Sequence, residues 1–360
     1  MQQPDQTILD TETDIDPGSL LAIPSPPVIG PTMYSKRIKL YEELEGMLGG
    51  KLLVYVTSDR PGFAAYIDGD VIDPFIDQLD KMRIQKKLSL YLYTRGGHVS
   101  VAWNIVNLLR LYCDELQVII PHNARSGGTL ISIGADSIIM TKQATLGPID
   151  PSVNTPLNPQ IPNTPQQFLP VSVEAVKGYL AFAKEELAIK DDIAMASILT
   201  KLSENVHPLV LGEVYRSQSQ IKMLAERLLS GKIKDAGKIQ EIISFLCSDS
   251  GSHDYTINRR EAKQKLGLNV VVPTDEEYDC IKAIYDNVSG ELGFRQPFDP
   301  HAVGTYSVKR VILESASGGS HYFETSWECN RIQVTNPMIP GLTQDAYQNQ
   351  ITFEGWKYEQ

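Results

Sequence analysis

Two glycine turns, each placed after an apolar run and before a helical pattern, constrain the fold of this chain more than any other feature. The first turn holds Gly96 and Gly97 and follows the alternating run 88–94. The second holds Ser126 and Gly127 and also follows an apolar run. Strand, glycine turn and helix repeated in this order predict parallel strands joined by crossover helices, which is an α/β fold.

Further runs extend the same alternation on both sides of these turns. Apolar residues at 102, 105, 106 and 109 share one face of a helix, and the segment 137–141 is short, apolar and bounded by polar residues. We expect strands at 51–57, 88–94, 116–121 and 137–141, and helices at 34–45, 71–82 and from residue 102 onward.

Changes in composition divide the chain into three parts. Residues 1–33 carry acidic side chains without lysine or arginine and then several prolines, which predicts a disordered tail. Residues 34–295 hold the strand and helix alternation. Residues 296–360 predict a β-rich extension, because the runs 308–313 and 321–327 flank a Ser-Gly-Gly turn.

Two segments within the middle part interrupt the alternation. The stretch 147–170 is rich in proline and too long for a simple connection, so we expect an irregular loop and leave its role open. Apolar residues then recur every three or four positions from 210 to 228, before Gly231. This spacing predicts a long helix whose seam packs on the core or on another subunit.

Composition excludes several classes of protein. No apolar stretch approaches the ~20 residues of a spanning helix, and no basic-then-apolar signal opens the chain, so we expect a cytoplasmic protein. A net charge of −11 argues against a nucleic-acid surface. The four cysteines are far apart and predict neither a zinc site nor a disulfide framework: Cys113, Cys247, Cys280 and Cys329.

Ser126 is the side chain best placed for chemistry. It lies between a strand and a helix, and the glycines after it allow another backbone to approach closely. The first amides of a helix have no partner within it and can donate to a developing oxyanion, which suits acyl transfer. The alternative is that Ser126 only caps the helix.

A serine nucleophile needs a base and an oxyanion hole. His253, beside an aspartate, has the best context among the histidines, and Lys177 borders the apolar stripe of a helix where burial would favour the neutral amine. Both stay open at this point. Backbone amides of Gly96 or Gly97 and of Gly127 would converge at adjacent strand ends as an oxyanion hole.

Four ordered motifs, at 91–97, 124–131, 140–152 and 252–262, resemble the serine dehydrogenase proteinase family. That family belongs with the Clp-protease and crotonase fold and is related to signal peptide peptidase A. The resemblance covers about residues 34 to 290. It implies a spiral of βαβ units and a serine peptidase.

Carried over by position, the resemblance makes Ser126 the nucleophile and Gly97 or Gly96 with Gly127 the oxyanion hole. The histidine that Clp-type enzymes have after the serine is missing, and Asp150 in that region is a site-shaping residue instead. Lys177 lies where the short type of signal peptide peptidase A has its lysine base. The resemblance therefore predicts a Ser126 and Lys177 dyad.

Together these features predict a serine peptidase that forms an acyl-enzyme on a peptide or protein substrate and needs no metal or organic cofactor. The resemblance also implies a homo-oligomer. The sequence carries neither a GxGxxG fingerprint nor a Walker motif. Two other functions stay open: a catalytically inactive interaction protein of this fold, and a crotonase-like acyl-thioester enzyme that uses the oxyanion hole alone.

Overall fold

The computed structural model describes residues 32–149, 152–162, 167–249, 254–299, 302–335 and 343–360. The tail predicted for residues 1–33 lies outside these ranges except for its last two residues. Residues 33–360 form one compact unit.

An eight-stranded sheet is the centre of this unit, with the strand order β10-β5-β3-β2-β1-β11-β12-β13. The pairs from β1 to β10 are parallel, as the alternation predicts, and those from β1 to β13 are antiparallel. Its strands are β1 (Lys51–Thr57), β2 (Gln85–Tyr93), β3 (Cys113–Ile120), β5 (Ser137–Met140), β10 (Val270–Val271), β11 (Gly304–Ser315), β12 (Gly319–Thr335) and β13 (Thr343–Glu359). Two small sheets contain β4 (Asn123–Ala124), β6 (Thr145–Leu146) and β9 (Ile257–Asn258), and β7 (Ser152–Val153) with β8 (Val171–Ser172).

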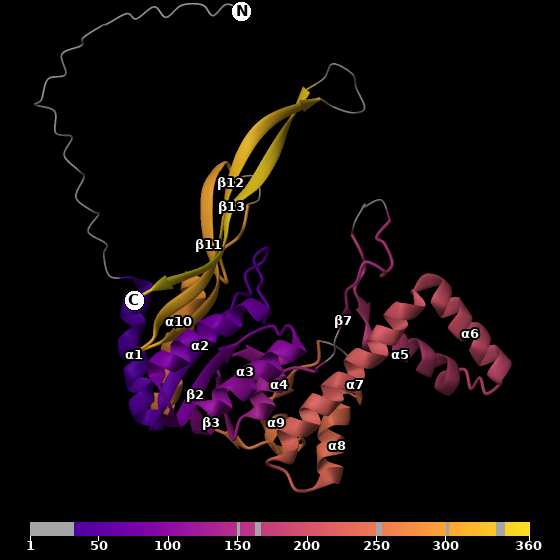
Figure 1. Cartoon of the computed structure of the whole chain (residues 1–360), viewed down its shortest axis with the longest axis horizontal. Helices are drawn as coiled ribbons and strands as arrows, with labels where there is room; N and C mark the ends of the chain where they lie inside the picture. The colour runs from indigo at the N-terminus through magenta and orange to yellow at the C-terminus, as the bar shows by residue number, and fades with distance from the viewer. Residues whose placement is uncertain (1–31, 150–151, 163–166, 250–253, 300–301, 336–342) are drawn as a thin grey trace, which may run out of the picture. The chain divides into compact units, whose positions relative to one another are not determined.

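Helices cover both faces of the parallel part of the sheet. They are α1 (Met33–Leu48), α2 (Ile72–Met82), α3 (Val99–Leu111), α4 (Gly127–Gly134), α5 (Val173–Ala181), α6 (Asp192–Asn205), α7 (Pro208–Ser230), α8 (Ala236–Ser244), α9 (Arg259–Gln264) and α10 (Asp275–Glu291), with short turns η1 (Gly69–Val71), η2 (Phe182–Glu186) and η3 (Phe245–Asp249). In Figure 1, α2, α3 and α4 lie side by side over the strands.

Strand β1 shows how the sequence produces these layers. Its side chains alternate between the two faces, so Leu53 and Tyr55 enter a core with α2, α3, α4 and α7. Leu52 and Val54 enter a second core with α1 and α10. Both faces of the strand are buried, which explains the nearly continuous apolar run at 51–57.

The segment predicted as a β-rich extension supplies three strands of the main sheet. Strand β11 pairs with β1 in antiparallel register, with Val54 opposite Glu314, and β12 and β13 follow as hairpins. The β12–β13 pairing continues to Thr335 and Thr343, past the last β11 pair at Cys329, as the long yellow hairpin in Figure 1 shows. A domain boundary near residue 296 stays a prediction.

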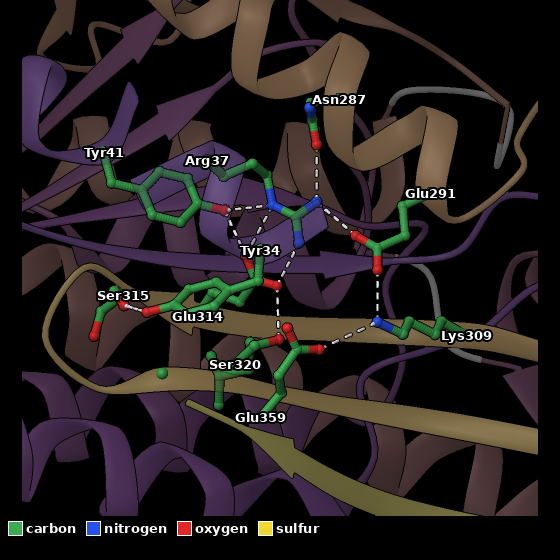
Figure 2. A network of polar contacts seen from close by, with 12 residues as sticks. Tyr34, Arg37, Tyr41, Asn287, Glu291, Lys309, Glu314, Ser315, Ser320 and Glu359 are labelled. Atoms are coloured by element: carbon green, nitrogen blue, oxygen red, sulfur yellow. Dashed lines mark hydrogen bonds and ion pairs between the residues drawn. The ribbon is translucent and has the colours of Figure 1, made fainter. Parts of the chain in front are cut away.

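A buried polar network joins this added sheet to the helices (Figure 2). The Arg37 guanidinium, wholly buried on α1, lies 2.5 Å from Glu314 on β11 and 2.5 Å from Glu291 on α10. Glu314 also accepts hydrogen bonds from Tyr41 and from Ser320, and Lys309 contacts Glu291. Burial opposes ionisation of Glu291, but Arg37 and then Lys309 outweigh it and lower the pKa of this carboxyl.

The seam predicted for 210–228 is confirmed as a core contact of the chain itself. Val210 and Val214 pack with β7 and β8, and Ile221 and Leu224 are buried further along α7. Near the end of the helix the buried residue is Leu229, and the helix ends before Gly231.

Two further observations concern the helices and the cysteines of the described residues. No described helix is both long and apolar enough to cross a bilayer. All four cysteines are buried and unlinked.

Candidate active site

Ser126 occupies a strained backbone position between β4 and α4. Its φ of 50° and ψ of −112° lie in a region that residues with a Cβ rarely adopt. Its side chain makes no capping hydrogen bond to the helix. The hydroxyl is therefore not used as a helix cap, and the structure holds the residue in a conformation that costs about 1–3 kcal/mol.

Thr94 joins the two glycine turns. Its backbone amide donates to the carbonyl of Asn123 at 3.1 Å, and its own carbonyl accepts the amide of Arg125 at 3.0 Å. Its side-chain Oγ1 accepts the amide of Gly96 at 3.0 Å. These bonds fix the first turn directly beside the residue that precedes Ser126.

Gly96 is present because another side chain would not fit. Its φ is +107°, and a Cβ built there would lie 2.7 Å from the Cβ of Ser126 and 2.8 Å from the carbonyl oxygen of Arg125. The backbone of the first turn therefore touches the serine without any side chain between them.

The amides of Gly97 and Gly127 have no acceptor among the described residues, whereas that of Gly96 is already bound to Thr94. The two glycines are close, since a Cβ built on Gly127 would lie 3.3 Å from the carbonyl oxygen of Gly97. Gly127 is also the first residue of α4, where the helix dipole favours negative charge. The turn at Gly97 and the start of α4 thus offer two unpaired donors.

Helix α4 is anchored along its buried length. The Thr129 hydroxyl donates to the carbonyl of Gly147 at 2.7 Å and accepts the amide of the same residue at 3.1 Å. At the far end, the Lys232 amine donates to the carbonyls of Ile133 and Ala135. Burial lowers the pKa of Lys232 to about 8. The nucleophile helix is thus held at both ends.

A cleft of about 530 Å³ opens beside Ser126. Gly97 and His98 line it from the first turn, Asp68 from the segment before η1, and Ile221 from α7. Ser152 also lines it, so the proline-rich stretch contributes to the wall of the cleft. The cleft is large enough for several residues of an extended peptide or for a small organic molecule.

The residues predicted for the site fall into three groups. Ser126 and Gly97 line the cleft, and Gly96 and Gly127 pack directly against them. Lys177 lies on α5, one third exposed, and its amine is 3.1 Å from Glu174. It is not among the cleft-lining residues, so its role stays a prediction.

The other two candidates, Asp150 and His253, lie outside the described residues. Among the described residues, no group of three or more His, Cys, Asp or Glu side chains is placed to hold a metal ion.

Sequence reasoning missed two ionisable residues of the cleft. His98 directly follows Gly97, and Asp68 lies in a turn far from any recognised motif; the His98 Nε2 and Asp68 Oδ1 atoms are 3.8 Å apart. The signal that was present is the position of His98 between the glycine turn and α3. Nothing in the sequence indicates that residue 68 returns to this turn, which depends on the pairing of Ile67 with Gly97.

Comparison with protein families places this geometry in context. Residues 78–293 match the family model described as ClpP-like SDH-type serine proteinase, which is more than half of the chain. The chain belongs to that family. Membership confirms the predicted family and its ClpP-like α/β fold.

Two curated relatives of the chain come from Methanocaldococcus jannaschii. The uncharacterized protein MJ0137 is 32% identical over 201 residues, which are 56% of this chain and 59% of the relative. The uncharacterized protein MJ1495 is 26% identical over 244 residues, which are 65% of this chain and 71% of the relative. The match to the first thus spans less than two thirds of its length.

Solved structures with weak overall similarity include two proteases. A mutant of the 1510-N membrane-bound stomatin-specific protease is 16% identical with a TM-score of 0.35, covering 67% of this chain and 86% of that one. A ClpP1 mutant from Listeria monocytogenes is 11% identical with a TM-score of 0.36, covering 69% and 99%.

Proposed function

We propose that this chain hydrolyses peptide bonds through an acyl-enzyme formed on Ser126. One observation carries the proposal: Ser126 lies in a strained conformation at the start of α4, lines the cleft, and has its hydroxyl free of any capping bond. Backbone strain of this size persists only where the surrounding structure holds the residue, and such residues cluster at active sites. Membership in a family of serine proteinases supports the same conclusion.

In the proposed reaction the Ser126 Oγ attacks the substrate carbonyl carbon while a base takes its proton. The carbonyl oxygen becomes an oxyanion, and the amides of Gly97 and Gly127 donate to it. The C–N bond then breaks, and the amine leaves with the proton. Water next attacks the carbonyl carbon of the ester through the same steps and releases the acid. Gly96, whose amide is bound to Thr94, holds the turn against the serine.

Lys177 is the base that the family resemblance nominates, and the dyad remains part of the proposal to be tested. Its amine must reach the serine hydroxyl in its neutral form to accept a proton. The amine lies 3.1 Å from Glu174, so the Lys177 side chain would have to leave this carboxylate and turn toward the cleft. Replacing Lys177 by alanine tests this role.

The experiment that tests the nucleophile is covalent labelling with a fluorophosphonate, followed by peptide mapping. We expect the label on Ser126 and no label on a Ser126→Ala variant. Ser217→Ala, which removes another hydroxyl lining the same cleft, is the matched control and should label normally. A label that survives Ser126→Ala would contradict the proposal. Binding of an acyl-thioester without labelling would favour the crotonase-like function, and neither result would favour an interaction protein.

Assembly and location are proposed on the resemblance alone. We propose a homo-oligomer acting on peptides or proteins in the cytoplasm. Sedimentation of the purified chain would check the first part, since a monomer at micromolar concentration would contradict it.

A further inference from the structure

The proposed function requires a base, and the following inference rests on it. The base must come within hydrogen-bond reach of Ser126, either directly or with a small side-chain rotation. Of the histidines in the described ranges, His98 alone lines the Ser126 cleft. The other three are used elsewhere.

The contacts of those three histidines show why they are poor candidates. His122 stacks on Tyr285 in a different cavity, and His207 caps α7. His321 is buried against Gln78 between the sheet and α2. None of these three side chains lines the Ser126 cleft.

The backbone of His98 is held firmly while its side chain is free to turn. Its amide donates to the carbonyl of Ile67 at 2.9 Å, and it stands at the start of α3 without a capping side-chain bond. The side chain is 69% exposed. The residue lies two positions after Gly96, which touches the Ser126 Cβ, and two residues of chain span at most about 7 Å. His98 and Ser126 thus lie on adjoining turns and line the same cleft.

Asp68 is the charged group nearest to the imidazole. Its Oδ1 accepts the amide of Gly69 at 2.6 Å, which fixes the carboxylate, and lies 3.8 Å from His98 Nε2. This distance exceeds a hydrogen bond, as is common for catalytic contacts before substrate binds. The other charged residue lining the cleft, Arg95, is paired with Asp59 at 3.1 Å.

We propose that His98 is the general base and acid for Ser126, and that Asp68 is a positioning residue that orients its ring. A carboxylate on Nε2 keeps the proton on that nitrogen and leaves the Nδ1 lone pair for the serine. Nδ1 takes the Oγ proton as the Oγ–C bond forms, and His98 gives it to the leaving amine as the C–N bond breaks. In the second half His98 takes a proton from water and returns it to Oγ as the ester bond breaks.

His98 and Lys177 differ in what each would need to act. Histidine is the side chain that enzymes use most often as a general base. A lysine needs burial and the absence of a carboxylate partner, whereas Lys177 is one third exposed and lies beside Glu174. His98 also lines the cleft, and Lys177 does not.

The experiment measures the rate of fluorophosphonate labelling of the full chain between pH 5.5 and 9. For His98→Ala we expect a loss of about 10²–10⁴-fold, partly restored by added imidazole, and a wild-type rate whose dependence on pH is lost in the variant. Asp68→Asn should displace that pH profile and lower the rate less. His207→Ala, which changes an exposed histidine outside the cleft, should label like the unaltered chain.

Two results overturn the inference, and a third affects the proposed function as well. If His98→Ala labels at the wild-type rate, His98 is not the base. If its labelling rate falls, but added imidazole does not restore it and its pH dependence matches that of the unaltered chain, His98 has only a structural role. Normal labelling of a His98→Gln variant would show the same. Failure of the unaltered chain to label at Ser126 overturns the proposed function together with this inference. Circular dichroism of each variant shows that the fold is kept.

Discussion

The Ser126 corner and the Arg37 network treat buried polar groups in opposite ways. Around Arg37, a guanidinium, two carboxylates and a phenol are buried together, and each has a partner within hydrogen-bond distance (Figure 2). At the corner, two amides lack an acceptor among the described residues, and Ser126 has a strained backbone. The chain thus satisfies its polar groups where they hold elements together and leaves them unsatisfied beside the nucleophile.

The difference shows which region can change without loss of the fold. The network connects α1, α10 and β11, so removing one partner leaves a buried charge on another element. The corner is supported by Thr94 and Thr129, which do not depend on the serine hydroxyl. Mutations at the corner should therefore separate activity from stability, and mutations in the network should not.

The largest expected effect is that of Ser126→Gly. We expect labelling and hydrolysis to fall at least about a thousandfold, because the nucleophile is lost. The free energy of unfolding should rise by about 1 kcal/mol, because glycine tolerates a positive φ without strain. Urea unfolding checks this, with Ser217→Gly as a control that should cost about 1 kcal/mol within a helix. A clear loss of stability in Ser126→Gly would show that the hydroxyl supports the corner.

Arg37→Met should lower the free energy of unfolding by about 3–5 kcal/mol. Glu314 would be left buried without its cation, which costs more than the lost attraction, and Glu291 would keep only Lys309. Chemical denaturation measures the loss. Lys201→Met, which removes an exposed ion pair with Glu204, is the control and should change stability by less than about 1 kcal/mol. Equal effects of the two substitutions would mean that the network is not a stabilising contact.

The smallest expected effect concerns Lys232 at the far end of α4. Burial lowers its pKa from 10.5 to about 8, so between these values the unfolded chain binds more protons than the folded chain. Its contribution to stability is therefore largest above pH 10.5 and is lost as the pH falls through 8. The stability of wild type relative to Lys232→Met should rise by about 2 kcal/mol from pH 7.5 to 9.5. A stability difference that does not change with pH would mean that the Lys232 amine is exposed to water.

The sequence predicted those parts of the molecule that rest on local patterns. The nearly continuous apolar run 51–57 corresponds to β1, and the glycine turns lie at strand ends as expected. Ser126 could be singled out because a serine between a strand and a helix is a local feature. Its strained φ was not predictable, because the local sequence does not show that Gly96 of another turn packs against this residue.

Contacts between distant segments were not predictable from the sequence. From the sequence, Arg37 would be predicted as a surface residue of a charged helix. Its partner Glu314 lies 277 residues further along the chain, so no local pattern indicates that the two are buried together. Asp68 and His98 meet only because Ile67 pairs with Gly97. The pairing of β11 with β1 also has no local signal, since alternating runs predict strands but not which strands pair.

The separation of Arg37 from Glu314 has a consequence for the order in which the protein is made. A ribosome releases the first strand and most of the parallel sheet long before β11 exists. Until α10 and β11 have been made, Arg37 has neither Glu291 nor Glu314 to accept its charge, and β1 has an open edge. A partly synthesised chain therefore differs from the complete protein in two ways: Arg37 is a cation without a carboxylate partner, and β1 is a strand with an unpaired edge.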